Sequence, residues 1–309
     1  MKVFISTFES IAMLLFIGLL GAWMVIRKMV KEDFFSLLSP LVLEISLPSF
    51  VFINIINNFN PFIKKDWWRL PLWWFFFTGI AFIVTLFGMI FVKRDKRREF
   101  GIALFYHNGI FFPIAIIGGI FGDNSNYLVD LFLFTIFYVS FFFNTSFLFF
   151  KNRGKIEWKK IFHPVFLATL FGIFLKLISF TYIPSFVISA LKMVGTMSIP
   201  LLMIVLGGNI IIDFKEVNAW YIGEIMKFLF FKNILMPLVM LGFVILIKPP
   251  YNVSLLMVLE GAVPPITAVP LIVERNGGNR LIVNQLVFSS FIFSLISIPF
   301  VMYLFRVLT

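Results

Sequence analysis

Residues 101–122 read GIALFYHNGIFFPIAIIGGIFG, an apolar stretch that is interrupted in its middle. As an α-helix, about 20 apolar residues cross the ~30 Å hydrocarbon core of a bilayer. The interruption consists of His107, Asn108 and Gly109, and Pro113 follows four residues later. Proline lacks an amide donor and clashes with the preceding turn. The stretch therefore predicts a membrane helix that is broken near the midplane.

A second interrupted stretch, LLMVLEGAVPPITAVPLIVE, covers residues 255–274. Glu260 lies within it, four residues before Pro264, and Pro265 follows directly. A broken helix in lipid is costly unless its freed amides and carbonyls face protein or a watery cavity. A plain proline kink is a sufficient explanation for one such stretch. Two stretches that both place Gly and a polar residue beside proline favour a functional site.

The remainder of the chain is equally apolar, since 61% of its 309 residues are hydrophobic and only 13% are charged. A soluble domain carries roughly 25% charged residues. Runs such as LFLFTIFYVSFFFN (131–144) lack the alternation of a barrel strand. We therefore predict an all-α polytopic membrane protein with ten transmembrane helices, at residues 5–26, 34–57, 70–92, 100–121, 127–150, 162–180, 184–212, 224–247, 252–273 and 281–305.

The basic residues predict how the chain is oriented. Sixteen Lys and Arg residues lie on one side of the predicted helices and six on the other, and the positive-inside rule places the richer side in the cytoplasm. Both termini are then extracytoplasmic. The net charge of +11 is thus a topology signal and does not indicate nucleic-acid binding. Three cations, Lys64, Lys65 and Arg69, are exceptions to the rule because they cluster on the side with fewer basic residues. The tryptophans near them predict an interfacial aromatic belt: Trp67, Trp68, Trp73 and Trp74.

Two pairs of prolines share one offset. Pro48 in ISLPSFVFI and Pro200 in MSIPLLMIV are 152 residues apart, and so are Pro113 and Pro265. Five helices per half place the second half in the membrane with inverted topology, an arrangement that is typical of secondary transporters. We predict two five-helix repeats and a cytoplasmic linker, at residues 1–150, 161–309 and 151–160 respectively.

Three stretches resemble motifs of the auxin efflux carrier family of permeases. They are NGIFFPIAIIGGIFG (108–122), similar to its Asn-x4-Pro crossover segment, SIPLLMIVLGGNI (198–210) and VPPITAVPLIVERNGG (263–278). The resemblance implies two inverted five-helix repeats with broken, crossing helices 4 and 9, and a transport domain that moves like an elevator. It also implies transport of small organic anions such as carboxylates or auxin-like acids. His107 and Glu260 depart from the family pattern.

The candidate substrate-binding residues surround these breaks and the repeated prolines. Asn108 is the first choice, because its amide both donates and accepts hydrogen bonds. Helix N-termini starting after Pro113 and Pro265 are expected to present free amides to a carboxylate. The full set of substrate-binding candidates is Asn108, His107, Gly109, Pro113, Pro264, Pro265, Ser46 and Ser198.

Three charged residues are candidates for ion or proton coupling. An intramembrane carboxylate such as Glu260 is a functional hypothesis by default. Glu44 lies four residues before Pro48, as Glu260 lies four before Pro264, and Lys192 is placed to reach an anion or pair with Glu44. His107 is equally compatible with proton coupling and with an interhelical hydrogen bond. Lys227 and Lys232 are expected to extend to the membrane surface.

The sequence predicts a carrier in the cell membrane, with an organic anion and lipid as partners. With two His and no Cys, no metal or other cofactor is expected. Proton coupling, sodium coupling and a homodimer all remain open. The alternatives are a sodium-coupled organic anion symporter, a channel or sensor subunit and, with least support, a membrane-embedded enzyme, for which no catalytic cluster is visible.

Overall fold

The computed structural model describes residues 2–31, 33–122, 125–150, 162–180, 182–214 and 220–309. The described chain is built of helices, and extended chain pairs at one isolated bridge, between His107 and Pro265. The predicted linker at residues 151–160 lies outside the described residues.

The first half of the chain follows the predicted spans. It contains α1 (Lys2–Ile26), α2 (Asp33–Pro40), the π-helical segment η1 (Leu41–Ser46), α3 (Leu47–Asn58), the 3-10 helix η2 (Trp67–Arg69), α4 (Leu70–Ile90), α5 (Arg97–Phe105), α6 (Phe111–Phe121), α7 (Asn126–Phe134), α8 (Tyr138–Thr145) and the 3-10 helix η3 (Ser146–Phe149).

The second half has a similar order of elements. It contains α10 (Pro164–Leu177), α11 (Ser185–Thr196), α12 (Ser198–Phe214), α13 (Ile222–Leu229), the π-helical segment η4 (Phe230–Leu235), α14 (Met236–Ile247), α15 (Tyr251–Ala262), α16 (Val269–Arg275) and α17 (Arg280–Leu308). Both π-helical segments end two residues before a proline, Pro48 or Pro237. A proline ring clashes with the carbonyl four residues earlier, so the turn before it widens.

Seven helical stretches in the described residues are long and apolar enough to cross a membrane. They are Phe4–Ile26, Asp33–Asn58, Trp67–Ile90, Asn126–Phe149, Ser185–Ile212, Ile222–Ile247 and Arg280–Leu308. Each coincides with a predicted span. The three other predicted spans correspond to the interrupted pairs α5/α6 and α15/α16, and to the 14-residue helix α10. The ten spans themselves remain a prediction.

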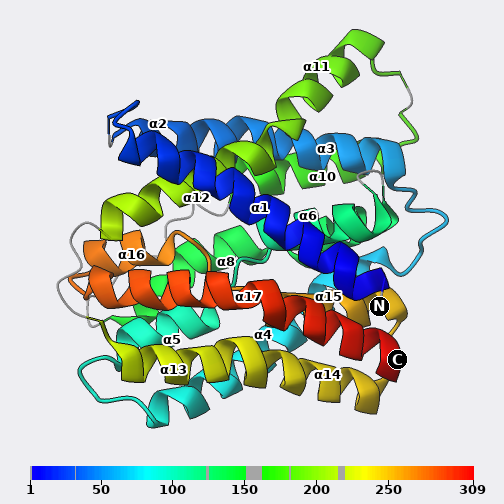
Figure 1. Cartoon of the computed structure of the whole chain (residues 1–309). Coiled ribbons are helices and arrows are strands. Elements are labelled where there is room, and N and C mark those ends of the chain that lie inside the picture. The colour runs from blue at the N-terminus through cyan, green and yellow to red at the C-terminus, as the bar shows by residue number, and fades with distance from the viewer. Residues whose placement is uncertain (1, 32, 123–124, 151–161, 181, 215–219) are drawn as a thin grey trace.

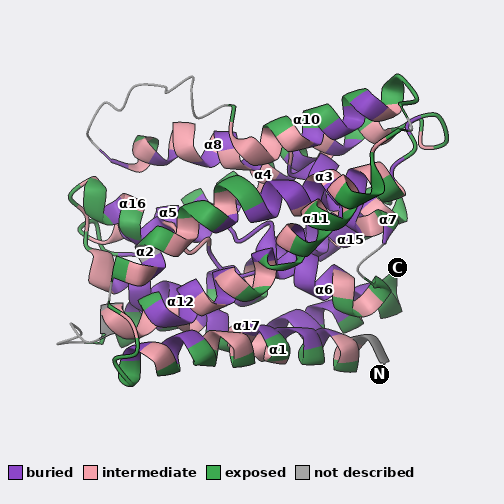
Figure 2. Ribbon diagram, turned by 90° about the horizontal axis from the view of Figure 1, so that it is seen from above, coloured by how far each residue is buried: buried purple, intermediate pink, exposed green. Residues whose placement is uncertain are grey.

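The helices form two groups that lie against each other (Figure 1). One group contains α2, α3, α10, α11 and α12, and the other contains α4, α5, α13, α14, α15 and α17. Helix α1 packs against α12 of the first group and against α17 of the second. Both ends of the chain lie at the same end of the bundle. Figure 2 shows that the buried residues lie mostly on helix segments in the interior of the bundle, while the exposed residues lie mostly on its outer faces.

Helices α1 and α12 cross in unusually close contact. A Cβ atom on Gly207 would lie 1.8 Å from the backbone oxygen of Gly18, and one on Gly21 would lie 1.9 Å from that of Ile204. Small residues let membrane helices approach closely enough for their backbones to pack. The glycines therefore fix α1 to the first group of helices.

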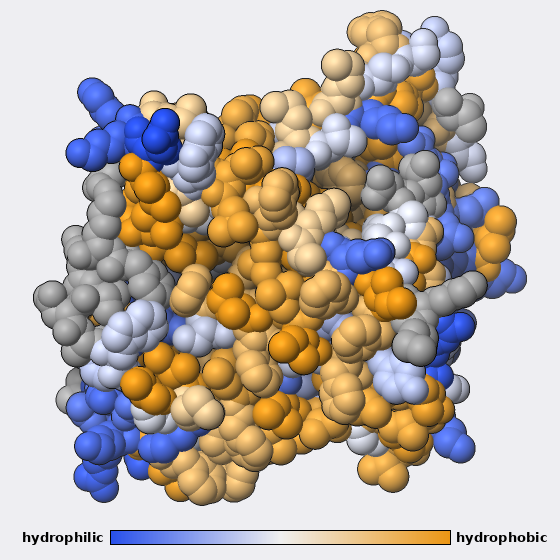
Figure 3. All heavy atoms as spheres, viewed as in Figure 1, coloured by the Kyte–Doolittle hydropathy of each residue, from blue (hydrophilic) through white to orange (hydrophobic). Residues whose placement is uncertain are grey.

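The molecular surface has the polarity expected of a membrane-spanning bundle. Figure 3 shows a broad apolar region across the middle of one face, with hydrophilic residues gathered towards the two edges where the helices end. Trp68 is 52% exposed and fits the predicted aromatic belt. The prediction was wrong for Trp74, which is 1% exposed and packs against the ring of Tyr138 in the interior.

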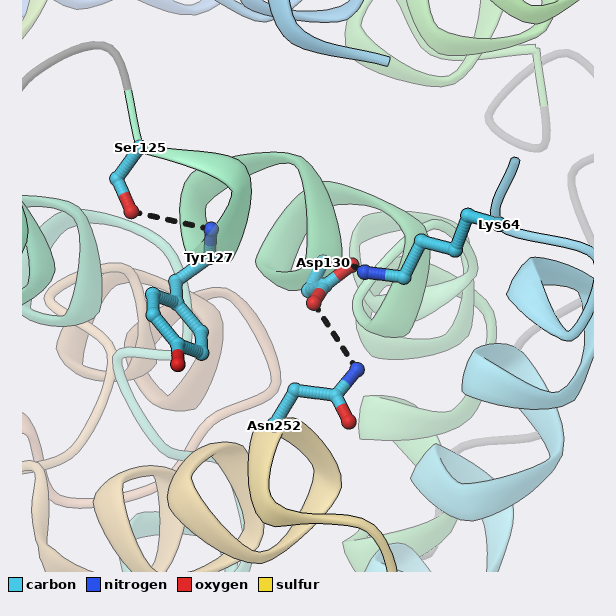
Figure 4. Close-up of polar contacts among 5 residues, drawn as sticks. All are labelled: Lys64, Ser125, Tyr127, Asp130 and Asn252. Carbon is cyan, nitrogen blue, oxygen red and sulfur yellow. Dashed lines mark hydrogen bonds and ion pairs between the residues drawn. The ribbon is translucent and has the colours of Figure 1, made fainter. Parts of the chain in front are cut away.

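A buried carboxylate explains why Lys64 is tolerated on the cation-poor side. The ammonium of Lys64 forms an ion pair with Asp130 on α7, whose side chain is 2% exposed. The other carboxylate oxygen of Asp130 accepts a hydrogen bond from Asn252 Nδ2 at 2.9 Å (Figure 4). Ser125 caps α7, since its Oγ accepts from the amide of Tyr127 at 3.1 Å. The segment after α3 is thereby tied to α7 and α15.

Candidate functional site at the helix crossing

The two predicted breaks meet in the interior of the molecule. Helix α5 ends at Phe105 and α6 begins at Phe111, while α15 ends at Ala262 and α16 begins at Val269. The amide of Asn108 donates to the carbonyl of Pro264 at 2.7 Å, and that of Ile266 donates to the carbonyl of Tyr106 at 3.0 Å. Each break therefore satisfies backbone groups of the other, which removes part of the cost of unwinding in lipid.

Proline sets where the helices end and restart. Val263 precedes Pro264 and has extended backbone, φ −70° and ψ 149°, since proline disfavours the helical region for the residue before it. Pro270 lies in the first turn of α16, where a missing amide costs nothing. The prediction that a helix starts after Pro113 was wrong, because α6 begins two residues earlier and contains Pro113 in its first turn.

His107 and Glu260 face each other across the crossing. Nε2 of His107 lies 2.9 Å from Oε2 of Glu260, and the two side chains are 5% and 0% exposed. The contact has the distance of an ion pair, and neither Nε2 of His107 nor Oε2 of Glu260 has a hydrogen-bond partner within the described residues. Buried polar groups without such a partner are rare in native proteins, so this pair marks the crossing as a candidate site.

Gly109 makes this contact possible. A Cβ atom at this position would lie 2.5 Å from Oε2 of Glu260 and 3.0 Å from the ring of His107. The carboxylate of Glu260 thus fills the space that any larger side chain at position 109 would need. Position 109 must therefore be Gly, because α15 approaches the chain too closely there for a larger side chain.

Aromatic residues hold His107 in place. Its backbone carbonyl accepts a hydrogen bond from the hydroxyl of Tyr138, and its ring contacts the edge of Phe77 at a centroid distance of 4.9 Å. The neighbouring Tyr106 hydroxyl lies 2.7 Å from that of Thr145. The break is therefore a fixed structure rather than a loose loop.

The side chain of Asn108 is buried but unengaged. It is 2% exposed, and its Nδ2 has no hydrogen-bond partner among the described residues. A buried donor without a partner costs about 1–3 kcal/mol, and such exceptions in native proteins call for an explanation. A polar ligand at the crossing would provide the missing acceptor.

Lys232 completes the site and was wrongly predicted to extend to the membrane surface. It is 1% exposed and lies on η4, which packs against α15, the helix that carries Glu260. The wider turn of η4 points both Lys232 and its neighbour Asn233 inwards. Its signal in the sequence was a cation eight residues inside a predicted span, which is a functional hypothesis in its own right.

Asn233 anchors this segment to α17. Its Nδ2 donates to the carbonyl of Ser290 at 3.2 Å and to Oγ of Ser297 at 3.3 Å, and its Oδ1 accepts from Oγ of Ser290 at 2.8 Å. A fully satisfied buried network is rigid. The network therefore fixes the position from which Lys232 reaches the crossing.

Comparison with known protein families agrees with this architecture. The family described as "Membrane transport protein" matches residues 6–157 and 148–302, nearly the whole chain. The chain belongs to this auxin efflux carrier-like family of membrane transport proteins. No curated protein matches it significantly. Together with the apolar helices, the family makes this chain a multi-pass membrane transporter.

The remaining candidates lie elsewhere in the transporter. Glu44 and Lys192 are both exposed, on packed elements η1 and α11, and within the described residues they form no ion pair with each other. Ser198 is buried and donates to the carbonyl of Gly195 at 2.6 Å, while Ser46 is 2% exposed at the end of η1. The crossing itself brings together His107, Asn108, Gly109, Glu260, Pro264 and Pro265.

A cavity beside His107, lined also by Thr78, Tyr106 and Tyr138, measures about 10 Å³. A volume near 10–15 Å³ is enough for about one water molecule. This cavity is therefore too small for an organic anion.

Proposed function

We propose that the protein is a secondary carrier of small organic anions such as carboxylates, with its binding site at the crossing of the two broken helices. The observation that supports this best is the buried set of His107, Asn108, Glu260 and Lys232 around two breaks that hydrogen-bond to each other. Burying ionisable groups in a membrane interior is costly, and such groups typically mark substrate and ion pathways.

The order of elements supports two inverted five-helix repeats, at residues 1–150 and 161–309. Each half has one helix or helix pair interrupted by unwound chain, α5/α6 and α15/α16, as its fourth unit. Inverted repeats place both termini on the same side, which we propose to be extracytoplasmic in the cell membrane. The two groups of helices correspond to a scaffold and a transport domain that slides against it in an elevator-like cycle.

Lys232 and Asn108 are proposed to bind the anion. An ammonium provides three donors and a point charge for a carboxylate. Lys232 and Glu260 lie on packed elements, η4 and α15, so in the proposed site an arriving carboxylate competes with Glu260 for the same cation. The unpartnered Nδ2 of Asn108 supplies an additional donor.

The charges of the site favour proton coupling. With Glu260 ionised and Lys232 protonated, the pair is neutral, so a bound monoanion adds one uncompensated negative charge. Buried net charge is expensive in a low-dielectric interior. One proton taken up by Glu260, with His107 at 2.9 Å as the nearest titratable neighbour, restores neutrality. We therefore propose that one proton accompanies each monoanion.

Uptake into proteoliposomes tests this function directly. Labelled monocarboxylates are supplied outside, with the pH gradient and sodium varied separately. The proposal predicts uptake that follows the pH gradient and does not depend on sodium. Uptake that requires sodium would support the symporter alternative, while single-channel currents would indicate a channel. If Asn108→Ala and Lys232→Met transport like the wild type, the crossing is not the binding site.

A further inference from the structure

A second cavity opens at the end of the bundle where both chain termini lie. It measures about 370 Å³ and is formed by the beginning of α1, the end of α6, the beginning of α15 and the end of α17. Small-molecule sites usually measure about 300–1,000 Å³. We call this cavity the terminal cleft and define it by Ser6, Phe121, Tyr251, Leu255, Phe305 and Arg306.

The terminal cleft combines aromatic walls with a cation. The ring of Tyr251 packs against Phe305 at a centroid distance of 5.6 Å. The ring of Tyr127 packs against those of Phe121 and Tyr251, at centroid distances of 4.3 Å and 6.2 Å. Arg306 lines the cleft and, within the described residues, forms no ion pair with a carboxylate. A guanidinium is a planar fork that matches a carboxylate bidentately.

A hydrogen bond of the residue next to Tyr251 fixes the aromatic wall of the terminal cleft. Asn252, next to Tyr251 in the chain, donates to Asp130, which also pairs with Lys64 (Figure 4). This ties the first turn of α15 to α7. The aromatic wall is therefore positioned before any ligand arrives, and preorganisation lowers the cost of binding.

The terminal cleft is separate from the crossing but shares a helix with it. Leu255 lines the cleft and stands five residues before Glu260 on α15. At 1.5 Å per residue, about 7–8 Å of helix separates the two positions. A ligand in the cleft is thus close to the crossing without touching its buried charges.

We propose that the terminal cleft is a second binding site, for a small organic anion with an aromatic or apolar body. Its carboxylate binds Arg306, assisted by the hydroxyl of Ser6, and its body packs between Phe121, Tyr251 and Phe305. The same chemistry fits the headgroup of an anionic lipid. The cleft volume and the aromatic walls favour a compact free anion, since the tails of a lipid would lie outside the cleft.

Equilibrium binding of 1-naphthoate to the purified full-length protein tests this site. In nanodiscs of phosphatidylcholine, the wild type should show two binding sites. Arg306→Ala should weaken one of them about tenfold or more, because a hydrogen bond to a charged group contributes roughly 1.5–3 kcal/mol. Lys232→Met should instead weaken the other site, so that failure of the crossing and failure of the cleft are distinguished.

Two matched variants sharpen the outcome. Arg69→Ala removes an exposed arginine outside the cleft and should bind naphthoate like the wild type. Tyr251→Leu, at a half-exposed residue, should weaken naphthoate but leave the binding of acetate unchanged. Unaltered naphthoate binding by Arg306→Ala overturns the proposal. It is also overturned if phosphatidylglycerol in the nanodiscs displaces naphthoate from the wild type, since the cleft is then a lipid site.

Discussion

Lys232 and Glu260 are both buried, on the packed elements η4 and α15, and we propose that their charges compensate each other. Removing one member of a buried pair leaves the other uncompensated and costs about 3–5 kcal/mol. We therefore expect Lys232→Met to lower Tm, and Lys232→Met combined with Glu260→Gln to recover most of the loss. Thermal unfolding of the purified single and double variants measures this coupling.

The matched control for this prediction is Lys227→Met. Lys227 is exposed and stands five residues before Lys232, so its replacement should leave Tm almost unchanged. Additive losses in the double variant would show that Lys232 and Glu260 do not interact. Equal losses for Lys227→Met and Lys232→Met would contradict the buried position of Lys232.

Gly109 provides a second test at the residue scale. In Gly109→Ala the new Cβ would meet Oε2 of Glu260 at 2.5 Å, so the carboxylate must move away from His107. We expect uptake to fall at least tenfold while the protein still folds. Gly79→Ala is the control, because nothing lies within 4 Å of a Cβ there. Uptake assays measure transport by both variants, and size-exclusion profiles show whether they fold. Normal transport by Gly109→Ala would contradict the close approach of Glu260 to position 109.

The sequence located part of this site. His107, Asn108 and Glu260 were found because a polar residue beside proline in an apolar span is costly and therefore informative. Lys232 was misjudged because it was treated as a long cation that reaches the membrane surface, although it stands eight residues inside a predicted span. The wider turn of η4 directs it inwards. Glu44 was selected by spacing alone. Glu44 lies on the outward side of η1 and is exposed. Tertiary packing decides which side of a helix faces outwards, and residue spacing alone does not reveal it.

At the scale of elements, the contact between α1 and α12 depends on glycine. In Gly207→Ala the added Cβ would lie 1.8 Å from the backbone oxygen of Gly18, which only a shift of a whole helix can relieve. Overpacking of this kind typically costs about 1–3 kcal/mol, so Tm should fall. The control is Gly223→Ala, at a position with open space. A wild-type Tm for Gly207→Ala would show that the two helices are not in backbone contact.

Hydropathy predicted most elements but not their interruptions in detail. Seven predicted spans are continuous helical stretches, because length and apolarity alone define a crossing helix. The sequence also placed both breaks, since proline acts locally. It did not place the start of α6, which begins at Phe111 before Pro113. The first turn of a helix tolerates proline, so proline marks a region rather than a boundary.

At the scale of the whole molecule, the proposed movement of one group of helices against the other determines which charges cross the membrane with the substrate. In an elevator-like cycle the crossing moves relative to the membrane, and each elementary charge that crosses 100 mV changes the free energy by about 2.3 kcal/mol. In the proposed cycle the empty site carries protonated Lys232 and ionised Glu260, whose charges sum to zero. The loaded site of that cycle carries Lys232, the monoanion and protonated Glu260, whose charges also sum to zero. Transport should therefore be independent of membrane potential.

Proteoliposomes in which potassium and valinomycin set the membrane potential separate the two driving forces. We expect a pH gradient alone to drive monocarboxylate accumulation, and a potential alone to drive none. In Glu260→Gln the proton acceptor is absent. The loaded site is still neutral because Lys232 balances the anion, but the empty site now carries one positive charge. Accumulation should therefore no longer respond to the pH gradient, while exchange of labelled for unlabelled anion persists. Accumulation driven by potential in the wild type would mean that an uncompensated charge moves with the substrate, and that Glu260 does not carry the coupled proton.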